Sequence, residues 1–401
     1  MTEPKNIDEL KIFKCGILTG FLKRTDNGCE FRYDEAFFQQ AHSAGISFHM
    51  PKTRKALANN GVNLFPFFAG LLPEGLRLKA LTKNLKTSAD DLFSIFAAIG
   101  SHVIGDVYAE PVEQALEKET PKLSQINFYE YFHKFLASNE IRKDESIAGV
   151  QEKISASMIS FPVNVAKKYA KYILKLNPAD KPNLVENEHY CMELARKCGI
   201  ETAKTKLVKD KDSNYGLLVT RFDRTWNSKE EKFLMHHQED ACQFLNKYPA
   251  EKYRISINDI VKGIEKHVPA AKVAILKLLQ LYAFSYLIGN GDLHAKNISL
   301  LIKSEGGLPE LSPAYDLICT YIYGDHKMAS KLDGRDDNLK RKNFIDFGLR
   351  FGIPEVACSK MLDKLLFKIK DHFSLLNQVP IAEKSRALLS GMFKKRFKDL
   401  S

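Results

Sequence analysis

Apolar residues recur with helical spacing over much of the second half of the chain. They return every three or four positions between residues 256 and 289, and again over Met361–Phe373 and Ala382–Phe397. This is the period of a helix with one buried face. Ala274–Ile288 is apolar almost throughout, so we expect that helix to be buried on all sides. The pattern predicts a mostly helical C-terminal part.

Shorter apolar runs dominate the N-terminal part. Lys11–Phe21 and Glu30–Tyr33 read as strands, and Leu76–Leu85 and Ala89–Ile99 as helices, with Ser88 as the N-cap of the second helix. Residues 110–123 are charged and flanked by proline, which predicts a linker or a surface loop.

Two further strands follow this charged stretch. Ile154, Ala156 and Met158 alternate with polar residues, as in a half-buried strand, and Tyr169–Leu176 forms the second. Lys175 lies on the opposite face of that second strand from its two neighbouring leucines.

The next predicted helix, Leu184–Cys198, carries a carboxylate on its apolar face. Glu188 falls on one stripe with Leu184, Cys191 and Ala195. A carboxylate in this position needs a partner, and the lysine of the preceding strand is the obvious one. A strand lysine paired with a helix glutamate positions the nucleotide phosphates in kinases. The alternative is an exposed glutamate near the helix start, where the helix dipole favours it.

The loop Ser146–Lys153 (SIAGVQEK) contains small residues just before a predicted strand. Such a loop can direct backbone N–H groups at phosphates. With one glycine, it can also be an ordinary hairpin loop. Farther along, Leu217–Phe222 is predicted to be a buried strand, and in a kinase-like layout the two lobes meet there.

The strongest chemical signal lies between residues 289 and 317. Asp292 is followed five residues later by Asn297, and a short hairpin beginning with the apolar run Ile298–Ile302 leads to Asp316. The hairpin should bring the second carboxylate back towards the first. Phosphoryl transfer needs one carboxylate to orient or deprotonate the attacking hydroxyl, and an Asn and a second carboxylate to hold Mg²⁺. A polar loop before a strand is the alternative.

Other patterns carry less weight. Asp346-Phe347-Gly348 spells D-F-G, but it lies past Asp316, so we interpret Asp346 as incidental. His236 and His237 could suggest a metal, yet adjacent side chains on a regular element do not face one ion.

Composition narrows the class of protein. The net charge of +11 favours an acidic partner, such as a nucleotide, a nucleic acid or an acidic protein surface. The seven cysteines are scattered and predict free thiols rather than disulfides or a zinc site. The N-terminus lacks a signal-peptide core, and the apolar run around Leu278–Ile288 is short for a bilayer span. We therefore expect a cytoplasmic protein that does not enter a membrane.

Several motifs occur in a recognisable order: SIAGVQEK at Ser146–Lys153, ILKL at Ile173–Leu176, NEHYC at Asn187–Cys191, VTRFDR at Val219–Arg224, QEDACQ at Gln238–Gln243, GDLHAKN at Gly291–Asn297, SPAYDL at Ser312–Leu317, and the N-terminal stretches Phe67–Gly75 and Ile99–Val107. Together they resemble HipA-type bacterial serine/threonine protein kinases, the toxins of HipBA toxin–antitoxin modules.

The resemblance implies an α+β, two-lobed, protein-kinase-like fold with an all-helical C-terminal lobe. It implies a β-rich N-terminal subdomain over residues 1–115, a kinase N-lobe core with a phosphate-binding loop over 116–247, and a helical C-lobe over 248–401. It also implies ATP and Mg²⁺ as cofactors, a protein substrate such as an aminoacyl-tRNA synthetase, and a HipB-like DNA-binding antitoxin as partner, with DNA contact only indirect or weak.

The same resemblance implies roles for particular residues. Asp292 would be the catalytic base, Asn297 and Asp316 the metal ligands, and Ser146 an inhibitory autophosphorylation site. The residues expected at the nucleotide are Ala148, Gly149, Val150, Gln151, Glu152, Lys153, Lys175, Glu188, Thr220, Arg221, Phe222, His294, Lys296, Asn297, Tyr315 and Asp316.

Two other functions remain open. GDLH followed by Asn297 also resembles the loop of aminoglycoside and choline phosphotransferases, which predicts a small-molecule kinase. An inactive binding subunit of a DNA-bound repressor complex is the second alternative, and the positive charge supports it. The complete set of Lys175, Asp292, Asn297 and Asp316 argues against an inactive protein.

Overall fold

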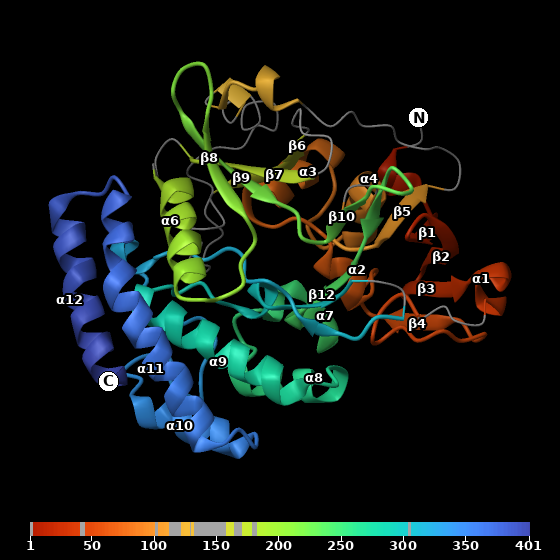
Figure 1. Cartoon of the computed structure of the whole chain (residues 1–401). Helices are drawn as coiled ribbons and strands as arrows, with labels where there is room; N and C mark the ends of the chain where they lie inside the picture. The colour runs from red at the N-terminus through yellow and green to blue at the C-terminus, as the bar shows by residue number, and fades with distance from the viewer. Residues whose placement is uncertain are drawn as a thin grey trace.

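The structure is a computed structural model that describes residues 3–40, 45–100, 103–111, 122–128, 130–131, 158–163, 171–178, 183–303 and 306–401. The predicted loop Ser146–Lys153 and the strand residues Ile154 and Ala156 lie outside this part of the chain. Figure 1 shows a β-rich half that contains the N-terminus and a helical half that contains the C-terminus.

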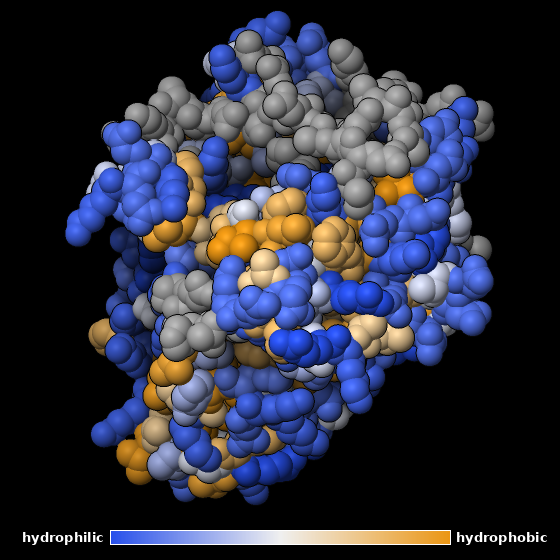
Figure 2. Space-filling model, turned by 90° about the vertical axis from the view of Figure 1, so that its right-hand side faces the viewer, coloured by the Kyte–Doolittle hydropathy of each residue, from blue (hydrophilic) through white to orange (hydrophobic). Residues whose placement is uncertain are grey.

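The N-terminal subdomain is an antiparallel sheet with helices packed on it. Its strands pair in the order β4-β3-β2-β1-β5. They are β1 (Glu9–Lys14), β2 (Ile17–Thr25), β3 (Gly28–Tyr33), β4 (Leu57–Asn60) and β5 (Val107–Pro111), and the helices are α1 (Glu35–Gln39), α2 (Pro66–Gly70), α3 (Gly75–Leu85) and α4 (Leu92–Ile99). Aromatic side chains from α2 and α4 fill a core of its own. Figure 2, a view onto this side, shows mainly hydrophilic side chains around a smaller hydrophobic patch.

Two local predictions in this subdomain are wrong. The run Lys11–Phe21 is not one strand, because Cys15 and Gly16 both adopt positive φ and turn the chain between β1 and β2. The N-cap of α4 is Asp91, whose side chain accepts a hydrogen bond from the Ser94 N–H, and not Ser88.

A four-stranded antiparallel sheet follows, in the order β6-β7-β9-β8. It comprises β6 (Ile159–Val163), β7 (Tyr172–Leu176), β8 (Thr205–Lys209) and β9 (Tyr215–Thr220), with α6 (Leu184–Lys197) beside it. Leu184, Glu188, Cys191 and Ala195 are all buried, as the stripe predicted. A hairpin of β10 (Arg224–Asn227) and β11 (Lys232–Met235) leads into the helical lobe.

The helical lobe is built around the long helix α9 (Figure 1). Its helices are α7 (Ala241–Phe244), α8 (Ile257–His267), α9 (Ala271–Ile288), α10 (Arg341–Arg350), α11 (Glu355–His372) and α12 (Glu383–Leu400). The lobe also carries a short sheet in the order β12-β13-β14, formed by β12 (His237–Asp240), β13 (Ser299–Ile302) and β14 (Glu310–Leu311). The predicted hairpin before Asp316 is therefore confirmed as β13–β14. The boundary at residue 247 stays a prediction, and β12 pairs across it with β13.

By length and composition alone, α9 could cross a membrane. However, 67% of its apolar window is buried inside the protein, where side chains from α6, α8, α10 and α11 belong to the same core. This is the burial expected of a central core helix.

A buried charge cluster joins the N-terminal subdomain to the helical lobe. Lys14 Nζ lies 2.7 Å from Asp106 Oδ2, and His237 Nδ1 lies 2.7 Å from Asp106 Oδ1. Across the ring, His237 Nε2 lies 3.0 Å from Glu239 Oε1. Burial and Lys14 lower the pKa of His237, but Asp106 and Glu239 outweigh them, so the pKa lies above its ordinary value.

This cluster predicts a pH-dependent stability. A group whose pKa is raised by folding stabilises the folded state below its unfolded pKa, about 6.5 for His, and loses that contribution as the pH rises through the folded value. The free energy of unfolding should therefore fall as the pH rises above about 6.5, by about 1.4 kcal/mol for each unit by which the pKa is raised. Asp106→Asn removes the nearest carboxylate, so denaturant titrations of this variant should show a flatter dependence. An equally steep dependence in the variant would contradict this assignment.

Candidate active site

The predicted site residues meet at a cavity of about 300 Å³ that all three parts of the protein line. The N-terminal subdomain contributes residues between Gly70 and Arg77 together with Ile99, Val103 and Ile104. The four-stranded sheet and α6 contribute Ser160, Lys175 and Glu188, with Met158 just before β6, and the helical lobe contributes the rest. Of the residues predicted from sequence, the cavity is lined by Lys175, Glu188, Asp292, His294, Lys296, Asn297, Tyr315 and Asp316.

Lys175 bridges two carboxylates at one end of the cavity. Its Nζ donates to both carboxylate oxygens of Glu188, at 2.7 and 2.9 Å, and also to Asp316 Oδ1. Lys175 is 7% exposed and Glu188 is 1% exposed, so both charges are withdrawn from water. Burial lowers the pKa of Lys175, but Asp316 and Glu188 outweigh burial and hold it above its ordinary value. The predicted Lys–Glu pair is confirmed, and the alternative of an exposed Glu188 is wrong.

Asp292 lies in the turn that follows α9. The helix stops at Gly289, whose φ of +74° suits a residue without a Cβ. The Asp292 N–H donates to Asn290 Oδ1 at 3.0 Å, and Asn297 Nδ2 donates to the Asp292 carbonyl at 2.9 Å. Asp292 itself is 1% exposed and lines the cavity. The five-residue spacing therefore closes the loop into a compact unit.

Asn297 and Asp316 suit a divalent cation. The Asn297 side-chain nitrogen donates a hydrogen bond to the Asp292 carbonyl. This bond fixes the orientation of the amide, whose oxygen is the atom that could bind a cation. Asp316 follows β14 and has a φ of +54°, an uncommon conformation for a residue with a side chain. Mg²⁺ prefers oxygen ligands and is held by one or two protein groups together with substrate phosphates. Among the described residues, no group of three or more His, Cys, Asp and Glu side chains could hold a metal ion. His236 and His237 are therefore not part of such a group.

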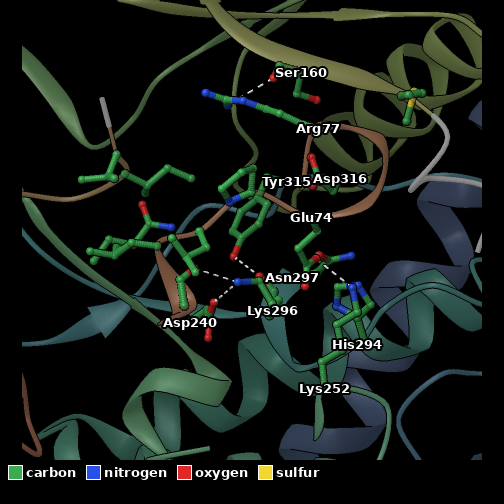
Figure 3. Close-up of a pocket in the computed structure, with 18 of the residues that line it drawn as sticks. Glu74, Arg77, Ser160, Asp240, Lys252, His294, Lys296, Asn297, Tyr315 and Asp316 are labelled. Atoms are coloured by element: carbon green, nitrogen blue, oxygen red, sulfur yellow. Dashed lines mark hydrogen bonds and ion pairs between the residues drawn. The ribbon is translucent and has the colours of Figure 1, made fainter. Parts of the chain in front are cut away.

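The Lys296 side chain reaches towards the N-terminal subdomain. Its Nζ donates to the Gly70 carbonyl at 2.7 Å and lies 3.3 Å from Asp240 Oδ2. The Tyr315 hydroxyl donates to the Lys296 carbonyl at 2.7 Å. Figure 3 shows these contacts on one side of the cavity. Lys296 therefore helps to fix this wall of the cavity.

The opposite side of the cavity holds an ion pair that the sequence did not reveal. Lys252 Nζ lies 2.7 Å from Glu74 Oε2, next to His294 in Figure 3. These two residues are 178 positions apart. No local pattern connects them, although Glu74 belongs to the quoted N-terminal stretch Phe67–Gly75. Arg77, whose Nη1 donates to the Ser160 carbonyl at 3.3 Å, was missed for the same reason.

Three predicted nucleotide contacts within the described part of the chain, Thr220, Arg221 and Phe222, do not line this cavity. The Arg221 guanidinium donates to both carboxylate oxygens of Asp223 and to the Val103 carbonyl, so it ties the end of β9 to the N-terminal subdomain. Phe222 packs its ring 5.7 Å from that of Tyr315. Thr220, Arg221 and Phe222 stay predicted contacts. Ser146, Ala148, Gly149, Val150, Gln151, Glu152 and Lys153 lie outside the described residues. Asp346 is exposed on α10 and does not line the cavity.

Comparison with known proteins identifies the family. Residues 145–373 match the model of the HipA-like C-terminal domain, and residues 10–110 match that of the HipA N-terminal domain. The chain belongs to the HipA family. The C-terminal match alone spans more than half of the sequence, and together the two matches span most of it.

HipA relatives are similar over most of their length. A putative kinase of Sinorhizobium fredii, Y4mE, is 27% identical over 326 residues, which are 76% of each protein. The serine/threonine-protein kinase toxin HipA of Shewanella oneidensis is 29% identical over 300 residues, which are 68% of this chain and 67% of that protein. A solved structure of Shewanella oneidensis HipA with HipB and operator DNA superposes with a TM-score of 0.79 at 20% identity, over 98% of this chain and 96% of that one. This likeness confirms the predicted kinase-like α+β fold.

Proposed function

We propose that the protein is an ATP- and Mg²⁺-dependent serine/threonine protein kinase of the HipA type. The observation that carries the proposal is the convergence of Lys175, Glu188, Asp292, Asn297 and Asp316 on one cavity, from three separate stretches of sequence. A strand lysine held by a helix glutamate, a buried aspartate in a fixed loop and an Asn–Asp pair are the groups that phosphoryl transfer requires.

Each group has a role that follows from its position. Lys175 would bind nucleotide phosphates while Glu188 fixes its ammonium group. Asp292 would orient the acceptor hydroxyl and take its proton. Asn297 and Asp316 would hold Mg²⁺, which when bound neutralises charge on the phosphates. Lys175 contacts Asp316 in this structure. In a nucleotide complex that contact would be replaced: Lys175 would contact the phosphates, and Asp316 would contact the metal ion.

The acceptor side supports a protein substrate over a small molecule. Next to the cavity lies a cleft of about 1870 Å³ between the N-terminal subdomain and the helical lobe. The cavity and the cleft share Leu72, Pro73, Glu74 and Lys252 as a common wall. Small-molecule pockets usually measure about 300–1,000 Å³. The size and position of the cleft favour a polypeptide acceptor, with a translation factor such as an aminoacyl-tRNA synthetase as our candidate.

The family also suggests partners and location. The Shewanella oneidensis relative was solved in complex with HipB and operator DNA. For this chain we propose a HipB-like antitoxin that contacts DNA directly, so that the kinase contacts DNA only indirectly or weakly. A cytoplasmic location follows from such partners.

Self-phosphorylation of Ser146 provides the test. Peptide mass spectrometry of the wild type after incubation with Mg²⁺ and ATP should find phosphate on Ser146, and Ser146→Ala should lack it. A phosphate adds about two negative charges. Because we propose that this loop faces ATP, the added negative charge should disfavour ATP there, and the modified protein should turn over ATP more slowly.

Two results would count against parts of this proposal. Phosphate on other residues but never on Ser146 would contradict self-inhibition at this loop. If ATP binds and no residue of the protein is phosphorylated, a small-molecule phosphotransferase becomes the better assignment.

A further inference from the structure

Tyr253 connects the proposed base to the acceptor cleft. It lies between the short 3-10 helix Pro249–Glu251 and α8, and its hydroxyl donates to Asp292 Oδ1 at 3.2 Å. Asp292 lines the nucleotide-side cavity and not the cleft, whereas Tyr253 lines the cleft and not the cavity. Tyr253 therefore reaches the carboxylate from the side on which an acceptor would arrive.

The ring of Tyr253 is held in place by the catalytic loop. It packs edge-on against His294, with the ring centroids 5.0 Å apart. The ammonium group of Lys252 lies 5.1 Å from its centroid and is itself held by Glu74. The backbone carbonyl of Lys252 accepts a hydrogen bond from the Ala295 N–H at 3.3 Å. Movement of the tyrosine is thus tied to movement of the loop that carries Asp292.

The contact acts on the carboxylate itself. The bonds from Asp292 to Asn290 and Asn297 involve its backbone N–H and carbonyl, so they fix the main chain but not the side-chain torsions. A hydrogen bond from a phenol to one carboxylate oxygen adds that constraint and directs the second oxygen. Burial, followed by the nearby Asp292, raises the pKa of Tyr253 far above its ordinary value, so the hydroxyl remains a donor.

We propose that Tyr253 is a positioning residue for phosphoryl transfer: by holding one oxygen of Asp292, it aims the other at an acceptor hydroxyl that enters through the cleft. This inference rests on the proposed kinase function. Transfer is sensitive to such alignment, because a small misplacement of a reacting group costs about 10²-fold in rate.

Tyr253→Phe tests this role because it removes the hydroxyl and keeps the ring against His294. With radiolabelled ATP, and with water and the protein itself as acceptors, kcat should fall about 10- to 100-fold. The KM for ATP and the Kd of a non-hydrolysable ATP analogue should be unchanged. A purely structural role would change nucleotide binding and thermal stability together with kcat.

Tyr282→Phe is the matched control. It also removes a tyrosine hydroxyl with a defined partner, the Ser330 carbonyl at 2.8 Å, but inside the core of the helical lobe. This variant should lose some stability and keep its kcat. If Tyr253→Phe turns over ATP as fast as the wild type or faster, or if both variants lose kcat equally, the positioning role is refuted while the kinase function stands. A wild type that transfers no phosphate refutes the kinase function itself.

Discussion

Replacing Asp292 with asparagine is expected to slow phosphate transfer by about 10²–10⁴-fold, the usual contribution of a general base. Asparagine has nearly the same shape but cannot accept the acceptor's proton. The nucleotide contacts proposed for Lys175, Asn297 and Asp316 stay intact, so the Kd for Mg²⁺-ATP should hardly change. Rates of ATP turnover and calorimetric titrations of the same preparation would measure the two effects separately.

Asp346→Asn is the control for this prediction, because Asp346 is the aspartate of the D-F-G sequence and is exposed on α10. The control should behave as the wild type. A large loss of activity in Asp346→Asn, with full activity in Asp292→Asn, would reverse the assignment of the two aspartates.

Replacing Lys175 with methionine is expected to damage both activity and stability. The variant loses the cation proposed to bind phosphates, so phosphate transfer should fall by at least about 10²-fold. It also leaves Glu188, which is 1% exposed, buried without its cation. Removing one partner of a buried pair costs about 3–5 kcal/mol. Denaturant unfolding would measure the stability, and ATP turnover the activity.

A double variant separates the two effects of Lys175. In Lys175→Met/Glu188→Gln the buried negative charge is gone, so most of the stability should return, while activity stays low. Burial already raises the pKa of Glu188 above its ordinary value, although Lys175 opposes the shift. The single variant should therefore become more stable as the pH falls and Glu188 takes up a proton. Full activity in either variant would contradict the role of the lysine.

The sequence predicted the local geometry around Lys175, Asp292 and Asp316 well because its signals are local. The spacing from Asp292 to Asn297 sets a tight loop, and the apolar run with its glycine turn predicted the hairpin that returns Asp316. The alternation of side chains along the strand predicted the face on which Lys175 lies, and the apolar stripe of the next helix predicted that Glu188 faces inward. Two buried opposite charges on facing elements attract one another. In the structure these predictions become contacts at 2.7–2.9 Å.

Contacts between distant segments could not be predicted in this way. Glu74 meets Lys252, and Lys296 meets the Gly70 carbonyl, only because the N-terminal subdomain packs on the helical lobe. The contact of the Arg221 guanidinium with the Val103 carbonyl depends on the same packing, while its predicted nucleotide contact stays a prediction. No periodicity encodes such pairings, since they depend on how separate cores are arranged.

The most direct measurement is covalent labelling of the wild type and Asp292→Asn with ATP that carries the label in either the γ- or the α-phosphate, in the presence of Mg²⁺. A kinase that uses this cavity will incorporate label from the γ-phosphate only, and will do so in the wild type far faster than in Asp292→Asn. Equal labelling of the two proteins, or none in the wild type, would contradict the proposal that Asp292 serves phosphate transfer from ATP to protein.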